Sequence, residues 1–216
     1  MLAIDLIKTI ERGSWRWIGQ RVAGISPMDI PIGGITIPAL LDHVGGSAWR
    51  IGRIHPRNAF VIDRPPLRLL YVRASYGGYG HAAKKVFPKT PWKVDFDHAF
   101  GRHMAQQLGF HYVLLIRIIP SVNRGHGRFE KAEPVKGFNL TKLCFANQRI
   151  LDKWIGRGPK FWNDHSRLLP YRLDRRDTLG LTLKQAGKWG YAMGVEDDPL
   201  PFTDLSPLHS PQWGKT

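Results

Sequence analysis

The chain has 216 residues, and 32 lysines and arginines against 17 aspartates and glutamates give it a formal net charge of +15. With 43% hydrophobic residues it can bury one sizeable core or two small ones, so a globular protein is expected. The absence of any run of about eighteen apolar residues argues against a membrane-spanning helix. The single cysteine, Cys144, excludes an intrachain disulfide.

The N-terminus has neither the short apolar segment nor the small-residue cleavage site of a secretory signal. One cysteine also fits a reducing compartment. A cytoplasmic location is therefore expected, and export by a signal-independent machine stays open.

Residues 1–47 are predicted to form a helix followed by a loop-rich arm. Over residues 2–22, apolar side chains recur at helical spacing and arginines lie on the polar side. Residues 23–47 contain three prolines and the pairs Gly33-Gly34 and Gly45-Gly46, which indicates a linker or an arm wrapped on the core.

Three short strands are predicted at 49–54, 59–62 and 67–72, separated by proline-containing turns. They would form a small antiparallel sheet that adjoins the next hairpin. The glycine-rich stretch from Ser75 to His81 precedes Lys84 and Lys85. It matches neither the Walker pattern nor the dinucleotide fingerprint, so a turn before a basic helix is favoured over a phosphate-binding loop. If it is functional, it would touch a nucleic-acid backbone.

The next segment has the pattern of a hairpin. Residues 93–97 alternate polar and apolar side chains, which predicts a half-buried strand that ends where Asp97 and His98 emerge. A second strand is predicted over the apolar run 112–118, and it would stop at Pro120 because proline cannot donate to a strand ladder.

A short helix is predicted over about 122–131, with Ser121 as its N-cap. Asn123 and His126, three residues apart, would share one face of this helix. Glu130 is expected to be a solvated carboxylate near the end of the helix.

Beyond it, apolar spacing predicts a helix over 139–155, with Lys142, Arg149 and Lys153 on its polar side, and a weaker helix over 181–193. The tail from 196 is proline-rich and is expected to be irregular. The predicted organisation is an N-terminal helix and arm (1–47), a central domain (48–160) and a basic, proline- and aromatic-rich extension (161–216).

Asp97, His98 and Asn123 supply the groups that phosphodiester hydrolysis needs. The reaction requires a base for water, a divalent cation at the phosphate and oxygen ligands for that cation. A neutral imidazole accepts a proton near pH 7, and carboxylate and amide oxygens suit Mg²⁺.

The order Asp-x-Asp-His at 95–98, then Asn-Arg-Gly-His at 123–126, resembles the HNH, or ββα-metal, nucleases, in particular the HNH domain of the CRISPR effector nucleases. The resemblance covers residues 92–131. It implies that Asp97 and Asn123 hold one divalent cation, that His98 activates water, and that His126 is a further ligand or a phosphate contact. Mg²⁺ is expected, with Mn²⁺, Ni²⁺ or Zn²⁺ as alternatives.

The resemblance also implies the fold: an α+β protein with a ββα-metal nuclease core, a small antiparallel sheet before it and helices around it. The chain departs from the family in two ways. Many members place an asparagine at the start of the second strand, where this chain has His111-Tyr112, so what orients His98 is left open. Many also carry two Cys-x-x-Cys pairs for a structural zinc, which a single cysteine cannot supply.

The positive charge indicates a polyanionic partner, and DNA is the expected one, with RNA left open. The basic residues run from Arg12 to Lys215 and form no single amphipathic helix, so a membrane is not expected as a partner. Arg124, Arg128 and Lys131, on or beside the site helix, are candidates for holding the scissile backbone.

Two alternatives remain open. In one, the chain is a non-catalytic, basic nucleic-acid-binding protein in which the Asp-His and Asn pattern is coincidental or degenerate. In the other, the same endonuclease chemistry serves an antibacterial toxin that a small acidic immunity protein neutralises.

Overall fold

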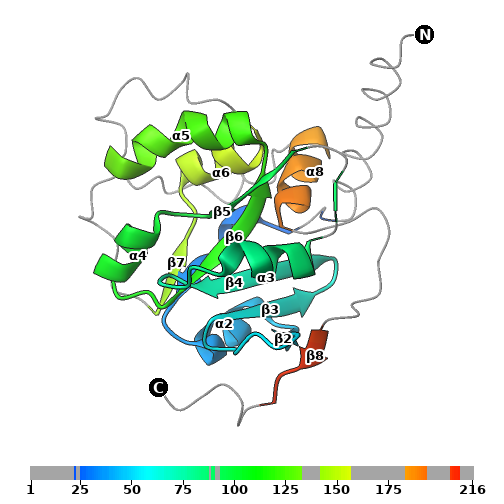
Figure 1. The fold of residues 1–216 in the computed structure, drawn as a ribbon. Coiled ribbons are helices and arrows are strands. Elements are labelled where there is room, and N and C mark those ends of the chain that lie inside the picture. Colours follow the sequence, from blue (N-terminus) through cyan, green and yellow to red (C-terminus); the bar gives the residue numbers. More distant parts are fainter. Residues whose placement is uncertain are drawn as a thin grey trace.

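The computed structural model describes residues 22, 25–87, 89–90, 93–132, 142–156, 183–193 and 205–209 (Figure 1). These residues form a mixed fold with an antiparallel sheet and several helices, consistent with the expected α+β class. The strands are β1 (Pro31–Gly34), β2 (Ser47–Ile51), β3 (Ala59–Arg64), β4 (Leu67–Arg73), β5 (Asp95–His98), β6 (Tyr112–Ile118), β7 (Leu143–Phe145) and β8 (Leu205–Pro207). The helices are η1 (Pro27–Asp29), α2 (Ile37–Val44), α3 (Tyr79–Val86), α4 (Arg102–Gln107), α5 (Pro120–Ala132), α6 (Gln148–Trp154) and α8 (Leu183–Ala192).

β6 is the strand on which the sheet is organised. The strand order is β7-β1-β6-β4-β3-β2-β8, and β5 pairs with β6 off this path. β4 pairs with residues 112–115 of β6, β1 with residues 112–113 and β5 with residues 115–118. All seven residues of β6 are buried. The continuous apolar run 112–118 therefore forms a strand that pairs with three others, β1, β4 and β5.

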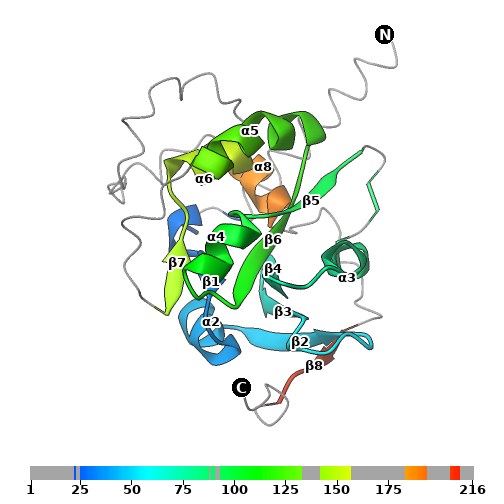
Figure 2. The same cartoon turned by 60° about the vertical axis from the view of Figure 1, so that its left-hand side comes forward.

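The two faces of the sheet carry separate cores. The larger core contains buried residues of α2, α4, α6 and α8 together with one face of β3, β4 and β6. The smaller core packs α3 against the opposite face, where Leu115 of β6 meets Ala82, Ala83 and Val86. In Figure 2, α3 lies to one side of the sheet, apart from α4, α5, α6 and α8. The face on which a side chain of β5 or β6 lies thus decides which helices it meets.

Residues 23–47 do not form the predicted loop-rich arm. They contain η1, β1 and α2, and β1 lies inside the sheet between β7 and β6. A Cβ at Gly33 would lie 2.9 Å from the ring of Phe100, and one at Gly34 would lie 2.6 Å from Leu40. The glycines that suggest a turn are in fact needed because these side chains pack directly on the backbone. The helix predicted over 2–22 lies outside the described residues, apart from residue 22.

The three strands predicted at 49–54, 59–62 and 67–72 are confirmed as β2, β3 and β4, which pair in that order. β4 pairs in turn with β6, so this small sheet adjoins the hairpin as expected. The strands predicted before His98 and over 112–118 are also confirmed, as β5 and β6. The helix that follows starts at Pro120. Ser121 is therefore inside the helix and is not its cap, because proline favours the first helical position.

The C-terminal half differs from the prediction at two places. A strand, β7, and a helix, α6, occupy the region predicted as one helix over 139–155, and Asn147 caps α6 by accepting a hydrogen bond from the backbone of Ile150 at 3.0 Å. The weaker helix over 181–193 is confirmed as α8. The tail is not wholly irregular, because β8 pairs with β2. In the described ranges, no helix has the length and apolar character needed to cross a membrane.

Candidate active site

β5 presents its side chains to two different sides of the sheet. Asp95 and Asp97 pair with Ile118 and Ile116, which lie on the face of the larger core. His98 pairs with Leu115, which belongs to the smaller core on the α3 side. Neighbouring side chains alternate between faces because the strand has a period of two. The two aspartates therefore share a face, and His98 lies on the other.

Among the described residues, the side chain of Asn123 is hydrogen-bonded to Asp95 and not to Asp97. α5 begins two residues after β6 ends, and the backbone N–H of Asn123 donates to the carbonyl of Ile119 at 3.1 Å. This first turn brings the side chain of Asn123 to β5, where its Nδ2 donates to Oδ2 of Asp95 at 3.2 Å. Both side chains are partly exposed. The hydrogen bond between Asn123 and Asp95 thus joins α5 to the Asp-x-Asp-His strand, β5.

Asp97 takes part in a buried ion-pair network. Nζ of Lys153, in α6, lies 2.5 Å from Oδ2 of Asp97 and 2.5 Å from Oε1 of Glu130, in α5. Arg149 donates to the same Glu130 oxygen at 3.3 Å. Lys153 and Arg149 are 0% and 1% exposed. Glu130 is therefore not the solvated carboxylate that was predicted, and the polar side of α6 faces these acids inside the protein.

Two positive and two negative side chains balance in this network, which is what burial of charges requires. Lys153 engages one of the two carboxylate oxygens of Asp97, Oδ2. The Asp97 side chain is 25% exposed, so one part of it still reaches the surface. The network joins β5, α5 and α6, and Figure 1 shows α5 and α6 side by side above the strand.

His98 is 5% exposed and packs against Tyr79, the first residue of α3, with ring centroids 4.7 Å apart in an edge-on geometry. Its Nε2 has no hydrogen-bond partner among the described residues. Burial lowers the pKa of His98 to about 4, against an opposing effect of Asp97, while Arg102 and Lys153 lower it further. The imidazole is therefore neutral at pH 7.

The other predicted site residues are placed along α5. His126 is fully buried, and Arg124 is exposed. Arg128 and Lys131 are in α5, but their side chains lie outside the described part of the chain. Tyr112, which stands where many family members place an asparagine, packs against Phe60 with ring centroids 5.1 Å apart.

Sequence reasoning missed two residues of the site, Lys153 and Tyr79. Lys153 was assigned to the polar side of a helix, because helical spacing alone does not reveal that carboxylates from two other elements surround it. Tyr79 lies near the end of the glycine-rich stretch, where α3 begins, and its contact with His98 depends on a pairing of elements that no local pattern encodes.

The donor set suits a hard cation with few protein ligands. Asp95, Asp97 and Asn123 offer two carboxylates and one amide, and magnesium is commonly held by one or two carboxylates while it keeps water and phosphate as its other ligands. The amide nitrogen of Asn123 faces Asp95, and turning the amide over would present its oxygen instead. Across the described ranges, no group of three or more His, Cys, Asp or Glu is placed to hold a metal ion, so neither a histidine- or cysteine-rich site nor a cluster of three carboxylates is formed there.

No protein-family profile matches the chain, and no curated protein or solved structure is significantly similar to it.

Proposed function

We propose that this chain is a metal-dependent endonuclease of the HNH type that hydrolyses phosphodiester bonds of DNA. The observation that carries the proposal is the contact between Asn123 and Asp95, which joins the helix of the motif to its Asp-x-Asp-His strand. The arrangement of elements also supports the proposal: β5 and β6 are antiparallel with α4 between them in the sequence, and α5 follows β6.

In this proposal Asp97 and Asn123 hold one divalent cation, and Asp95 adds an oxygen that the motif comparison alone did not assign. A bound cation would neutralise charge on the scissile phosphate and on the departing 3′-oxygen. The carboxylate of Asp97 is kept in place by Lys153, which leaves its other oxygen for this role. Arg124, exposed on the first turns of α5, together with Arg128 and Lys131, would hold the phosphate backbone beside the site.

His98 is the proposed general base. Its low pKa keeps the ring neutral, and Nε2 is the nitrogen that has no partner in the described structure. To take a proton from water at the carboxylate side, the imidazole must leave Tyr79 and turn around the end of β5. Because the Cβ of His98 points to the α3 side, this motion requires a change of backbone conformation at the last residue of the strand as well as a new side-chain rotamer.

A second candidate is a nucleic-acid-binding protein without catalysis. The observation that favours it is the buried pairing of Asp97 with Lys153, together with the position of His98 on the opposite face of β5. In that case Asp97 serves the stability of the fold, and the net charge of +15 accounts for binding.

The deciding experiment incubates the purified protein with supercoiled plasmid and Mg²⁺, with and without EDTA. Wild type is expected to nick or linearise the plasmid, and EDTA is expected to stop it. His98→Ala and Asn123→Ala are expected to lower the rate by about a hundredfold or more, because each removes a group that acts on the reacting atoms.

His103→Ala is the matched control. His103 is exposed in α4, where it pairs with Gln107, so its removal should leave the rate unchanged. Cleavage that survives EDTA and both site variants would contradict the proposal. DNA binding with no cleavage in any sample would favour the second candidate.

A further inference from the structure

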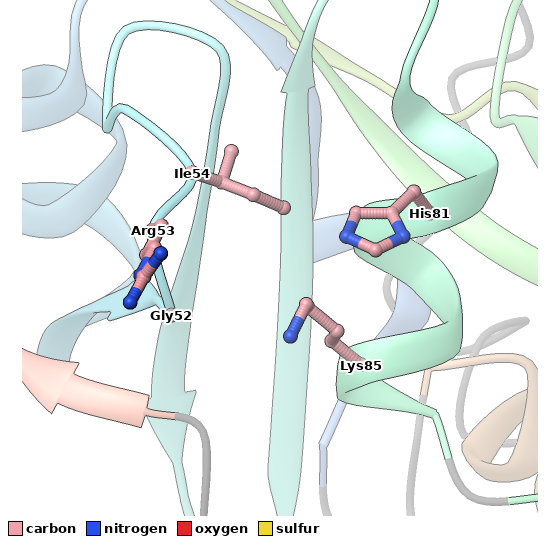
Figure 3. Close-up of a pocket in the computed structure, with 5 residues that line it drawn as sticks. All are labelled: Gly52, Arg53, Ile54, His81 and Lys85. Carbon is pink, nitrogen blue, oxygen red and sulfur yellow. The ribbon is translucent and has the colours of Figure 1, made fainter.

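A cavity of about 530 Å³ lies between α3 and the loop that joins β2 to β3 (Figure 3). Its walls are formed by Gly52, Arg53 and Ile54 of the loop and by His81 and Lys85 of the helix. Figure 3 shows His81 and Lys85 extending from α3 toward the loop, with Ile54 extending toward them from the other side. A cavity of this volume is in the usual range for sites that bind small ligands or single nucleotide units.

The polar side chains that line this cavity are an arginine, a histidine and a lysine. Arg53 and His81 are exposed, Lys85 is partly exposed, and none of the five lining residues is acidic. His81 and Lys85 are four residues apart in α3, so they lie on the same face of the helix. Arg53 lines this space from the loop and His81 and Lys85 line it from the helix, and phosphate is an anion that such donors bind well.

The rest of the wall suits the sugar that accompanies a phosphate. Ile54 is 9% exposed and contributes apolar surface, and Gly52 adds no side chain that would fill the space. Gly52 has a φ of +49°, a conformation that favours glycine and lets the loop turn away directly after β2. The shape of the cavity thus depends on a loop whose backbone a side chain would strain.

The cavity is connected to the candidate active site through α3. Tyr79, which packs against His98, is the first residue of that helix, and Arg102 lies over the ring of Tyr79 at 5.6 Å. At 1.5 Å of rise per residue, Lys85 is about 9 Å farther along the helix axis than Tyr79. A strand held in the cavity would therefore be able to run along α3 toward the side of β5 on which His98 lies.

We propose that Arg53, His81 and Lys85 bind one backbone phosphate of a nucleic-acid strand, at a site separate from the ion-pair network of Asp97 and Lys153. The inference rests on the nucleic-acid partner in the proposed function but not on cleavage. The role of this pocket is to position the nucleic-acid strand, and no residue of α5 or β5 is among those that line it.

The test measures binding of a fluorescent DNA duplex by anisotropy in EDTA, where cleavage does not interfere. Arg53→Gln/Lys85→Gln is expected to weaken binding by about tenfold and to lower the slope of log K against log salt by about 1 for each residue, because each removes one phosphate contact. The loss should be the same for unrelated DNA sequences, since phosphate contacts carry no base specificity.

The matched control is Arg57→Gln/Lys84→Gln. Both residues are exposed, one on the same loop and one on the same helix, and neither lines the cavity. The control makes the same change in net charge but removes no side chain from the cavity. Screened long-range attraction alone should therefore weaken binding by less than about threefold. Equal losses in the two double variants, or no loss in the first, would overturn the inference.

A second measurement separates this inference from the proposed function. Titration of the wild type with inorganic phosphate, followed by NMR, is expected to shift the ring resonances of His81, and Arg53→Gln/Lys85→Gln should abolish the shift. If wild type binds DNA and loses affinity in Arg53→Gln/Lys85→Gln but cleaves no plasmid, this inference stands and the nuclease proposal falls; if wild type binds no DNA, both fall. The opposite outcome is that wild type cleaves plasmid while phosphate leaves the His81 resonances unchanged and Arg53→Gln/Lys85→Gln leaves DNA affinity unchanged. In that case the nuclease proposal stands and this inference falls.

Discussion

His98 combines deep burial with a contact to Tyr79, and this combination gives the residue a measurable effect on stability. The folded protein resists protonation of the ring, because burial lowers its pKa to about 4. In the unfolded chain the same ring titrates near its ordinary value of about 6.5. Between these values the unfolded state binds more protons, so the free energy of unfolding must fall as the pH falls from about 6.5 toward 4.

We expect His98→Gln to remove that part of the pH dependence. Urea unfolding in EDTA at pH 7.5 and pH 5 should show that wild type loses about 2 kcal/mol more than the variant over this interval. His103→Gln is the control and should follow wild type, because its exposed ring is not part of this burial. Parallel losses in wild type and His98→Gln would contradict the geometry described for His98.

Lys153 is the residue whose removal should cost the most in the ion-pair network. Lys153→Met keeps the length of the side chain but leaves the carboxylates of Asp97 and Glu130 near each other without their shared ammonium. Breaking a buried charge pair on one side typically costs about 3 kcal/mol or more, so the urea midpoint should drop clearly. Lys142→Met, at an exposed position, should change the free energy of unfolding by less than about 0.5 kcal/mol.

The same variant tests whether the two carboxylates converge. Millimolar Mg²⁺ should raise the melting temperature of Lys153→Met more than that of wild type, because a cation can replace the missing ammonium and binds the folded state alone. An equal response of the two proteins to Mg²⁺ would show that the carboxylates separate once Lys153 is gone.

At the scale of elements, the turn between α2 and β2 depends on two glycines that differ in their surroundings. Gly45 has a φ of +74° and no atom within 4 Å of an added Cβ. Gly46 has a φ of +89°, and an added Cβ would lie 2.2 Å from the carbonyl oxygen of Asp63 in β3. Both positions disfavour a side chain, but only the second brings that side chain into a neighbouring strand.

Gly45→Ala should therefore lower the free energy of unfolding by about 1 kcal/mol through backbone strain alone. Gly46→Ala should lower it by about 2 kcal/mol more, because the β2–β3 pairing at Ser47 and Asp63 must open. Urea denaturation of the two variants measures the difference directly. Similar losses in the two variants would mean that β3 can move away from the added methyl group without lowering the free energy of unfolding.

How far the sequence predicts an element depends on where its contacts come from. β6 was predictable to its ends because an apolar run and a proline are both local signals. β1 was not, because Pro-Ile-Gly-Gly has the composition of a turn and becomes a strand through the close approach of Phe100 and Leu40. β8 was missed for a related reason, since its pairing partner, β2, lies far away in the sequence.

The candidate site shows the same limit. The motif located Asp97, His98 and Asn123 on the correct elements, because residue type and order are local information. It did not predict that Asn123 would meet Asp95, or that a lysine of α6 would meet Asp97. Those contacts follow from how α5 and α6 pack over β5, which only the tertiary structure determines.

At the scale of the whole molecule, the sheet separates two groups of polar side chains: an ion-pair network on one face and a basic cavity on the other. The ion-pair network of Asp97, Glu130, Arg149 and Lys153 lies on the face of the larger core. The cavity with Arg53, His81 and Lys85 lies with α3 on the other face. β5 stands at the boundary, since it sends side chains to both.

The way β6 is surrounded also bears on how the protein opens. Backbone amides that are buried and paired with neighbours on both edges exchange with solvent only when the whole fold unfolds. Deuterium uptake should therefore be slowest in β6 and fast in β8, an edge strand whose Ser206 and Pro207 are exposed. The slowest amides should be those of residues 112–115, which pair with β4, whereas β5 pairs with residues 115–118, so the Asp-x-Asp-His strand should exchange faster than the middle of the sheet.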